Sequence, residues 1–242
     1  MKKLLLIAMV GALAGSVFAS EDEIVAKRHW TPVQFNLFSP LGLPWADRDV
    51  NGLRMNLIYG RSVNVTGLDL GLVGATHASM CGLQINGYNH VEGAFFGVQF
   101  SPFANFTVKK NCGVQFAGLL NWGLDDGMGL QMALLNFCGA FTGVQLGLVN
   151  WDSGLDYGIA LGGFNIADAD FTGCALAPLN ICYGNLRGCQ IGVFNMVAGQ
   201  SEGLQLGLFN ASNEHTGVQI GLLNLNCNGQ VPLMAIVNVN FR

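Results

Sequence analysis

One short unit repeats along nearly the whole chain, and it constrains the fold more than any other feature. Gly203–Asn210 reads Gly-Leu-Gln-Leu-Gly-Leu-Phe-Asn, and Gly217–Asn224 repeats it as Gly-Val-Gln-Ile-Gly-Leu-Leu-Asn. The first glycine of each unit, numbered here as position zero, is Gly52, Gly67, Gly82, Gly97, Gly113, Gly129, Gly143, Gly158, Gly173, Gly188, Gly203 or Gly217. Weaker units begin at Pro32 and Pro232. This self-similarity predicts a single repeat architecture.

The apolar positions within the unit predict how its chain turns. Glycine, aliphatic residues and few charges favour strands. A straight strand would place positions one, three and five on one face, yet the strictly apolar positions are one, three and six. This change of phase predicts a corner after position three, with small residues at position four. The fold expected is an all-β, three-sided β-solenoid with about 15 residues per coil.

The same argument assigns an inside to the coil. Positions one, three, six and eight, together with position thirteen, are expected to fill an apolar core. Leu206 stands at position three, so an Asp at this position is expected to cost several kcal/mol. A change at Glu202, in the outward loop, is expected to cost within about 0.5 kcal/mol.

An up-and-down outer-membrane β-barrel of about 14 strands is the alternative fold. The last residues support it, because Leu233, Ala235, Val237, Val239 and Phe241 occupy every second position and end on an aromatic residue, as barrel strands do. Pro102 and Pro178 argue against it, because an interior barrel strand needs every backbone N–H. The sequence therefore favours the solenoid.

Two amide columns are the candidate functional residues. Stacked coils would bring the position-seven asparagines within about 4.8 Å of one another, and we predict that they form a structural ladder: Asn89, Asn136, Asn150, Asn165, Asn180, Asn195, Asn210 and Asn224. The position-two glutamines are either an outward ladder that binds a partner or a ladder that satisfies its own amides, which we favour. The candidate interaction ladder comprises Gln145, Gln190, Gln205 and Gln219.

No motif for catalysis, cofactor binding or metal binding is found in the sequence. The acidic residues Asp152, Asp156, Asp168 and Asp170 match no calcium motif, and a solvated rim is the expected arrangement. Asp152 with Asp168 is the only candidate for paired carboxylates that cleave a glycan. The chain is therefore interpreted as non-enzymatic.

Seven cysteines are present, an odd number that cannot close completely into disulfides. Cys174 and Cys189 occupy position one of adjacent units. Parallel stacking aims their side chains alike, so we expect them to be reduced core residues. Cys138, Cys182 and Cys227 lie near loops and are the more plausible redox candidates.

Four segments are expected along the chain. Residues 1–19 have the basic start, apolar run and small residues of a secretory signal peptide. Residues 20–51 contain the weak first unit and an insertion, Ser39–Asn51, that caps the first coil or forms a binding loop. Residues 52–231 are the tandem repeats, and residues 232–242 form a C-terminal strand. Exposed solenoid ends leave end-to-end self-association open, and scattered basic residues give no support for nucleic-acid binding.

These repeats behind a leader resemble the bacterial surface-repeat proteins built on tandem GLQIGLxN motifs, best at Gly143–Asn150, Gly188–Asn195, Gly203–Asn210 and Gly217–Asn224. The units at Gly158 and Gly173 depart from the motif by losing the glutamine. The resemblance implies an exported protein of the cell envelope (outer membrane, cell surface or periplasm) with no established activity. A structural or adhesion scaffold is the expected function, with unknown partners that include outer-membrane or cell-surface components. A barrel that forms a pore and a glycan-acting solenoid enzyme are the alternatives.

Overall fold

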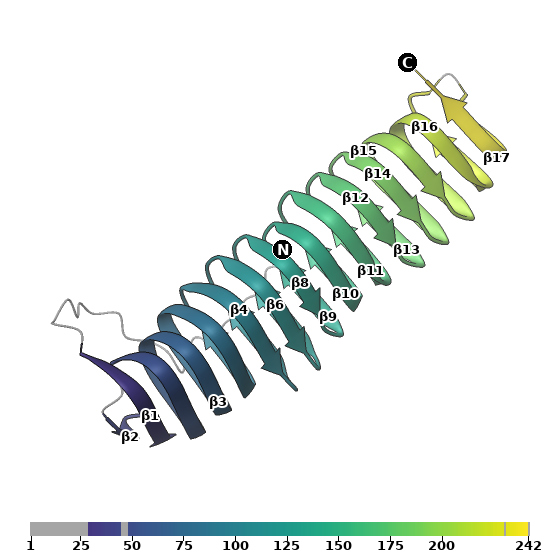
Figure 1. The fold of residues 1–242 in the computed structure, drawn as a ribbon. Coiled ribbons are helices and arrows are strands. Elements are labelled where there is room, and N and C mark those ends of the chain that lie inside the picture. The colour runs from purple at the N-terminus through teal and green to yellow at the C-terminus, as the bar shows by residue number, and fades with distance from the viewer. Residues whose placement is uncertain (1–28, 45–47, 230, 242) are drawn as a thin grey trace, which may run out of the picture.

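The chain forms a parallel β-solenoid. The computed structural model describes residues 29–44, 48–229 and 231–241, and it has about 13 coils with about 15 residues in each (Figure 1). The predicted solenoid is confirmed. Neighbouring repeats pair in the parallel sense, which an up-and-down barrel does not allow. The predicted signal peptide, residues 1–19, lies outside the described residues.

The strands follow one another along the rod in chain order. They are β1 (Trp30–Phe38), β2 (Leu41–Leu43), β3 (Asp49–Val91), β4 (Ala94–Ser101), β5 (Ala104–Thr107), β6 (Asn111–Ala117), β7 (Leu120–Gly123), β8 (Gly127–Met132), β9 (Leu135–Cys138), β10 (Phe141–Asp152), β11 (Asp156–Ala167), β12 (Phe171–Leu176), β13 (Leu179–Cys182), β14 (Leu186–Ile191), β15 (Phe194–Leu206), β16 (Phe209–Asn226) and β17 (Leu233–Asn240).

Each coil stacks on the next with like residues opposite one another. Gly143 pairs with Gly158, and Asn150 pairs with Asn165. Where the strands of a coil are separate, a longer strand surrounds position zero and a shorter one contains the asparagine, as β12 and β13 do. We call the residues at positions ten to fourteen, which return the chain to the next coil, the closing segment.

The corner is where the sequence predicted it, but the inside and the outside of the coil are reversed. Positions two, four, seven, nine and thirteen face inward. Gln205 is fully buried, whereas Leu206 is 40% exposed. Of the predicted core positions, only thirteen is confirmed, by Phe95, Phe171 and Leu186. The prediction that Asp at Leu206 enters a core is therefore wrong.

Glycine at position zero is required by the close approach of successive coils. These glycines have φ between 125° and 145°, a region that residues with a Cβ rarely adopt. A Cβ on Gly158 would lie 1.9 Å from the carbonyl oxygen of Gly143. The glycine column thus lets each coil settle directly on the one before it.

Short antiparallel strands lie at both ends of the parallel stack. β2, from the insertion predicted as a cap, pairs with the edge of β1. β17 pairs with β16 at the other end, and Asn238 of β17 turns inward and donates to Gln219 Oε1 at 3.1 Å. Each end of the stack is therefore covered in part by a strand of the opposite direction. Residues 45–47 of the insertion lie outside the described residues.

Candidate functional site

A continuous asparagine ladder runs through the interior. The Nδ2 of each asparagine donates to the Oδ1 of the next one toward the C-terminus, as from Asn136 to Asn150 at 2.9 Å and from Asn195 to Asn210 at 2.8 Å. The ladder comprises Asn89, Asn105, Asn121, Asn136, Asn150, Asn165, Asn180, Asn195, Asn210 and Asn224. Every predicted member of the structural ladder belongs to it.

Two members of this ladder were missed by the sequence analysis. Asn105 and Asn121 belong to coils with one extra residue between position four and the asparagine. Counting from the glycine therefore placed them at position eight. Alignment on the asparagines themselves would have found them, because the spacing from Asn89 through Asn136 remains 15 or 16 residues.

The glutamines form a second internal ladder. Gln145 donates from Nε2 to Gln131 Oε1 at 3.1 Å, and Gln219 donates to Gln205 at 2.7 Å. The four candidate interaction residues, Gln145, Gln190, Gln205 and Gln219, are at most 2% exposed. A partner on the outer surface would not touch them. The alternative of an outward, partner-binding glutamine ladder is therefore wrong, and the amides hydrogen-bond to one another.

The two ladders point in opposite directions. Asparagine amides donate toward the C-terminal end, and glutamine amides donate toward the N-terminal end. Aligned amide dipoles add within each ladder. The dipoles of the two ladders therefore oppose each other along the rod.

A buried ion pair lies near the N-terminal end of the glutamine column, between Gln34 and Gln84. Arg54 and Asp69 stand at position two of successive coils, and both side chains are fully buried. Arg54 Nε donates to Asp69 Oδ1 at 2.7 Å, and Nη2 donates to Oδ2 at 2.6 Å. Opposite charges at the same position of neighbouring repeats were the sequence signal that we did not use.

The carboxylate of Asp69 also ends the amide ladder. Gln84 and Asn86 each donate to its Oδ2 at 2.9 Å, and Asn56 donates to its Oδ1 at 2.8 Å. Burial by itself would raise the pKa of Asp69, but Arg54 and these amide donors outweigh it and hold the pKa below its usual value. The negative charge meets the donor end of the glutamine ladder, which is the favourable orientation.

Between Gln84 and Gln219 the glutamine column is interrupted once, at Ala160 and Ala175. Asp152 and Asp156 fill part of the space and border a cavity of about 10 Å³, which is room for about one water molecule. Asp152 Oδ1 accepts from Gln145 Nε2 at 2.8 Å, and Asp156 Oδ1 accepts from the backbone N–H of Phe141 at 2.9 Å. The Oδ2 of Asp156 has no hydrogen-bond partner.

Both carboxyls at this interruption favour their neutral form. Burial raises the pKa of Asp156 to about 7. Burial, together with repulsion from Asp156, raises the pKa of Asp152 well above its usual value. The expected solvated rim of carboxylates is therefore wrong for these two residues, which lie inside the coil.

The other two acidic residues lie in closing segments. Asp168 Oδ2 accepts from Trp151 Nε1 at 3.1 Å, and Asp170 Oδ1 accepts from the backbone N–H of Asn185 at 2.7 Å. Asp152 is only 4% exposed, so the pair proposed for glycan cleavage lacks an open side for a sugar. No three His, Cys, Asp or Glu side chains come together as a metal site in the part of the chain that the structure describes.

The cysteines differ from the sequence expectation. Cys174 and Cys189 form a disulfide between adjacent coils, with Cα atoms 4.7 Å apart. They lie at position one, which faces outward, so the prediction of reduced core residues is wrong. Burial raises the pKa of Cys138 above its usual value and that of Cys182 to about 11. These two thiols therefore stay protonated and unreactive, whereas Cys227 is exposed.

The outward side chains form one apolar surface over the two strand-bearing sides of the coil. We call it the outer apolar surface, and its most exposed columns, at positions five and six, include Leu72, Phe103, Leu119, Leu134, Leu148, Phe164, Phe194, Leu208, Phe209, Leu222 and Leu223. At the N-terminal end it deepens into a groove of about 1060 Å³ between β2 and the first coils, lined by Phe35, Leu41, Met55 and Leu72 among others.

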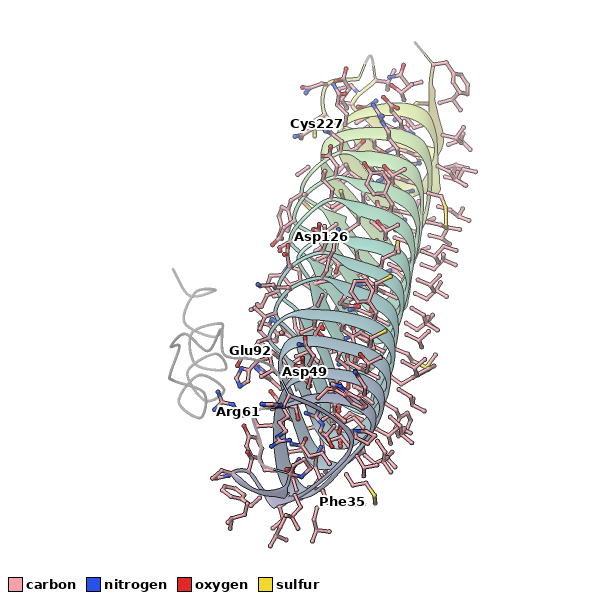
Figure 2. All side chains as sticks on the ribbon, turned by 60° about the vertical axis from the view of Figure 1, so that its left-hand side comes forward. Phe35, Asp49, Arg61, Glu92, Asp126 and Cys227 are labelled. Atoms are coloured by element: carbon pink, nitrogen blue, oxygen red, sulfur yellow. A yellow bond between two sulfur atoms is a disulfide. The ribbon has the colours of Figure 1, made fainter. Side chains whose placement is uncertain are left out.

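Charge is confined to the opposite part of each coil. Among the described residues after Gly67, every charged side chain that is not inside the coil stands in a closing segment: Glu92, Lys109, Lys110, Asp125, Asp126, Asp168, Asp170, Arg187, Glu202 and Glu214. In Figure 2 the labelled Glu92 and Asp126 lie along one edge of the rod, and carbon-rich side chains project from the other. The rod is thus amphipathic across its width.

No protein-family model matches the chain, and no curated protein or solved structure is significantly similar to it. No helix long and apolar enough to cross a membrane occurs in residues 29–44, 48–229 and 231–241. The function is therefore argued from the geometry of the rod itself.

Proposed function

We propose that this chain is an exported, non-enzymatic scaffold of the bacterial cell envelope that acts through the outside of its rod. The observation that carries the proposal is the division of each coil into an internally satisfied polar inside and an outer apolar surface. The amides of the two ladders are paired with one another, and the few interior carboxyls have no open approach for a substrate. What remains available to a partner is the outside.

The leader and the repeats support the location. Residues 1–19 have the pattern of a secretory signal, and the repeat resembles surface-repeat proteins. An exposed apolar surface of this extent marks an interaction site on a soluble or membrane-associated protein. A structural or adhesive role follows from a long, regular rod that presents the same side chains at every coil.

Export is the property to measure. The full chain is expressed in a Gram-negative host, and the N-terminus and the envelope fraction are analysed. The expected result is cleavage after Ala19 and recovery with the envelope. A matched chain with Leu6→Arg and Val10→Arg, which interrupt the apolar run of the leader, is expected to stay in the cytoplasm. Recovery of both chains in the cytoplasm, uncleaved, would contradict the proposal.

A further inference from the structure

The outer apolar surface is too large to be left in water. The rod is about 60 Å long if 13 coils repeat every 4.8 Å. Four residues of β12, Gly173–Leu176, lie outside the closing segment, and β13 also has four residues, so each side is about 13 Å wide. The product of the length and the two widths is on the order of 1,600 Å², whereas the largest apolar patch of a monomer is usually about 300–600 Å².

The shape of this surface favours a fluid occupant over a second rod. Its two sides meet at the corner formed by positions five and six, and the charged closing segment is the third side, opposite that corner. A second copy lying against one side would leave the other side bare. Hydrocarbon chains cover both sides and the corner at once.

The depth of the surface fits one leaflet of a bilayer. Each side is about 13 Å from the closing segment to the corner, and the hydrocarbon of one leaflet is about 15 Å thick. The length of about 60 Å is twice the whole hydrocarbon core. The rod therefore fits lying along the membrane with its corner inward.

Aromatic residues with polar ends mark the boundary between the apolar and charged parts. Trp151, at position eight, lies next to the closing segment and donates its indole N–H to Asp168. Tyr157 and Tyr183 stand at the last and the first position of their closing segments, next to the apolar sides, and are about half exposed. Trp and Tyr gather at the membrane–water interface because their rings are apolar and their N–H or O–H groups remain hydrated.

The backbone also suits contact with hydrocarbon. Strand hydrogen bonds run between coils, along the rod, so the side-chain faces expose no unpaired ladder groups. Lipid-exposed backbone must be satisfied within the protein. The interior amides are likewise paired with one another, so lying in lipid adds no unsatisfied polar group along the sides.

We propose that the outer apolar surface inserts into the hydrocarbon of a single membrane leaflet, with the rod parallel to the membrane and the closing segments in water. The partner is lipid acyl chains. In the cell this rests on the proposed envelope scaffold, because it names the partner of that scaffold. Binding to vesicles does not require export, so the two proposals fail separately.

Flotation with phosphatidylcholine vesicles tests the proposal. The lipid is zwitterionic because the chain has a formal charge of -4, and every chain carries Leu6→Arg and Val10→Arg so that the leader does not bind. Leu148 and Leu208 are at the corner and are 54% and 47% exposed. The chain with the unchanged surface is expected to float, and L148D/L208D to lose about a hundredfold in partitioning for each Asp at hydrocarbon depth.

A matched variant separates insertion from a general effect of added charge. Leu124 and Leu155 have similar exposure, 50% and 52%, but lie in closing segments. L124D/L155D receives the same two charges and is expected to float like the parent. Circular dichroism follows the β-content of each chain, so that a misfolded variant is replaced by the single change L222D at the same corner.

Three results would overturn the proposal. The parent chain stays at the bottom of the gradient, or L148D/L208D floats as well as the parent, or L124D/L155D loses flotation equally. Sedimentation of the lipid-free chain examines the rival occupant. A parent dimer that L148D/L208D converts to a monomer, without vesicle binding by the parent, would assign the surface to a second copy.

Discussion

The inside and the outside of one coil reverse the usual placement of polar and apolar residues. Inside, amides at positions two and seven are buried and bonded to their equivalents in neighbouring coils. Outside, leucines and phenylalanines at positions five and six are about half exposed. Burying a polar group is costly only when it lacks a partner. Stacking supplies that partner, and the apolar residues are left for an external one.

The largest effect is expected where the internal pairing is broken. Asn136→Leu removes the acceptor of Asn121 and the donor to Asn150 Oδ1 and to the carbonyl of Leu146. Leu146 O still accepts from the backbone N–H of Ala133, so two ladder groups lose their partner at about 1–3 kcal/mol each, and a loss of about 2–6 kcal/mol in unfolding free energy is expected by denaturant titration. Asn228→Leu, at an exposed asparagine, should change stability by within about 0.5 kcal/mol. Equal losses would show that the ladder is not what stabilises the coil.

The close stacking that makes the ladder possible is tested at position zero. Gly143→Ala places a methyl group 2.0 Å from the carbonyl oxygen of Gly129, at φ of 145°. Backbone strain of this kind costs about 1–3 kcal/mol by itself, and the contact adds to it. We expect a fall of about 3 kcal/mol or more in the same titration. An unchanged midpoint would mean that adjacent coils can separate without penalty.

The interruption of the glutamine column is expected to make stability depend on pH. The pKa of Asp156 is about 7 in the folded chain and that of Asp152 is higher still. Their contribution to stability is fully present below about pH 4, the unfolded pKa, and is lost as pH rises through the folded values. For Asp156 the difference amounts to about 4 kcal/mol.

The matched chain for this prediction is D152N/D156N, which keeps both oxygen acceptors and removes the titration. Burial also lowers the pKa of His90 and His215, so their contribution is lost as the pH falls. The difference in melting temperature between the two chains is therefore the measured quantity. It is expected to favour the double variant increasingly from about pH 4 to pH 8, and a difference independent of pH would place the carboxyls in water.

The smallest effect is expected on the outside. Leu206→Asp changes a side chain that is 40% exposed, so the lipid-free chain should lose no more than about 1 kcal/mol. A substitution to Asp at the buried Gln205 would instead disturb its hydrogen bonds with Gln190 and Gln219. A loss of several kcal/mol at Leu206 would restore the apolar core that the sequence suggested and overturn the assignment of inside and outside.

Particular residues show why the site was only partly predictable. The asparagine column was visible because its members recur at equal spacing and can bond to one another in stacked coils. Asp152 and Asp156 were not recognised as interior residues. Their burial depends on Ala160 and Ala175, which remove two glutamines in the following coils. The disulfide between Cys174 and Cys189 was not predicted, because the sequence alone did not show that position one faces outward.

The sequence by itself determined the period, the corner and the columns of equivalent residues. These follow from repetition, because identical units stacked in register must place like beside like. Only the tertiary structure decided which face of the chain is the inside. Alternation identifies residues that share a face, but it is unchanged when the two faces are exchanged. The direction in which the backbone bends at each corner breaks that symmetry, and here it encloses the amides and leaves the leucines outside.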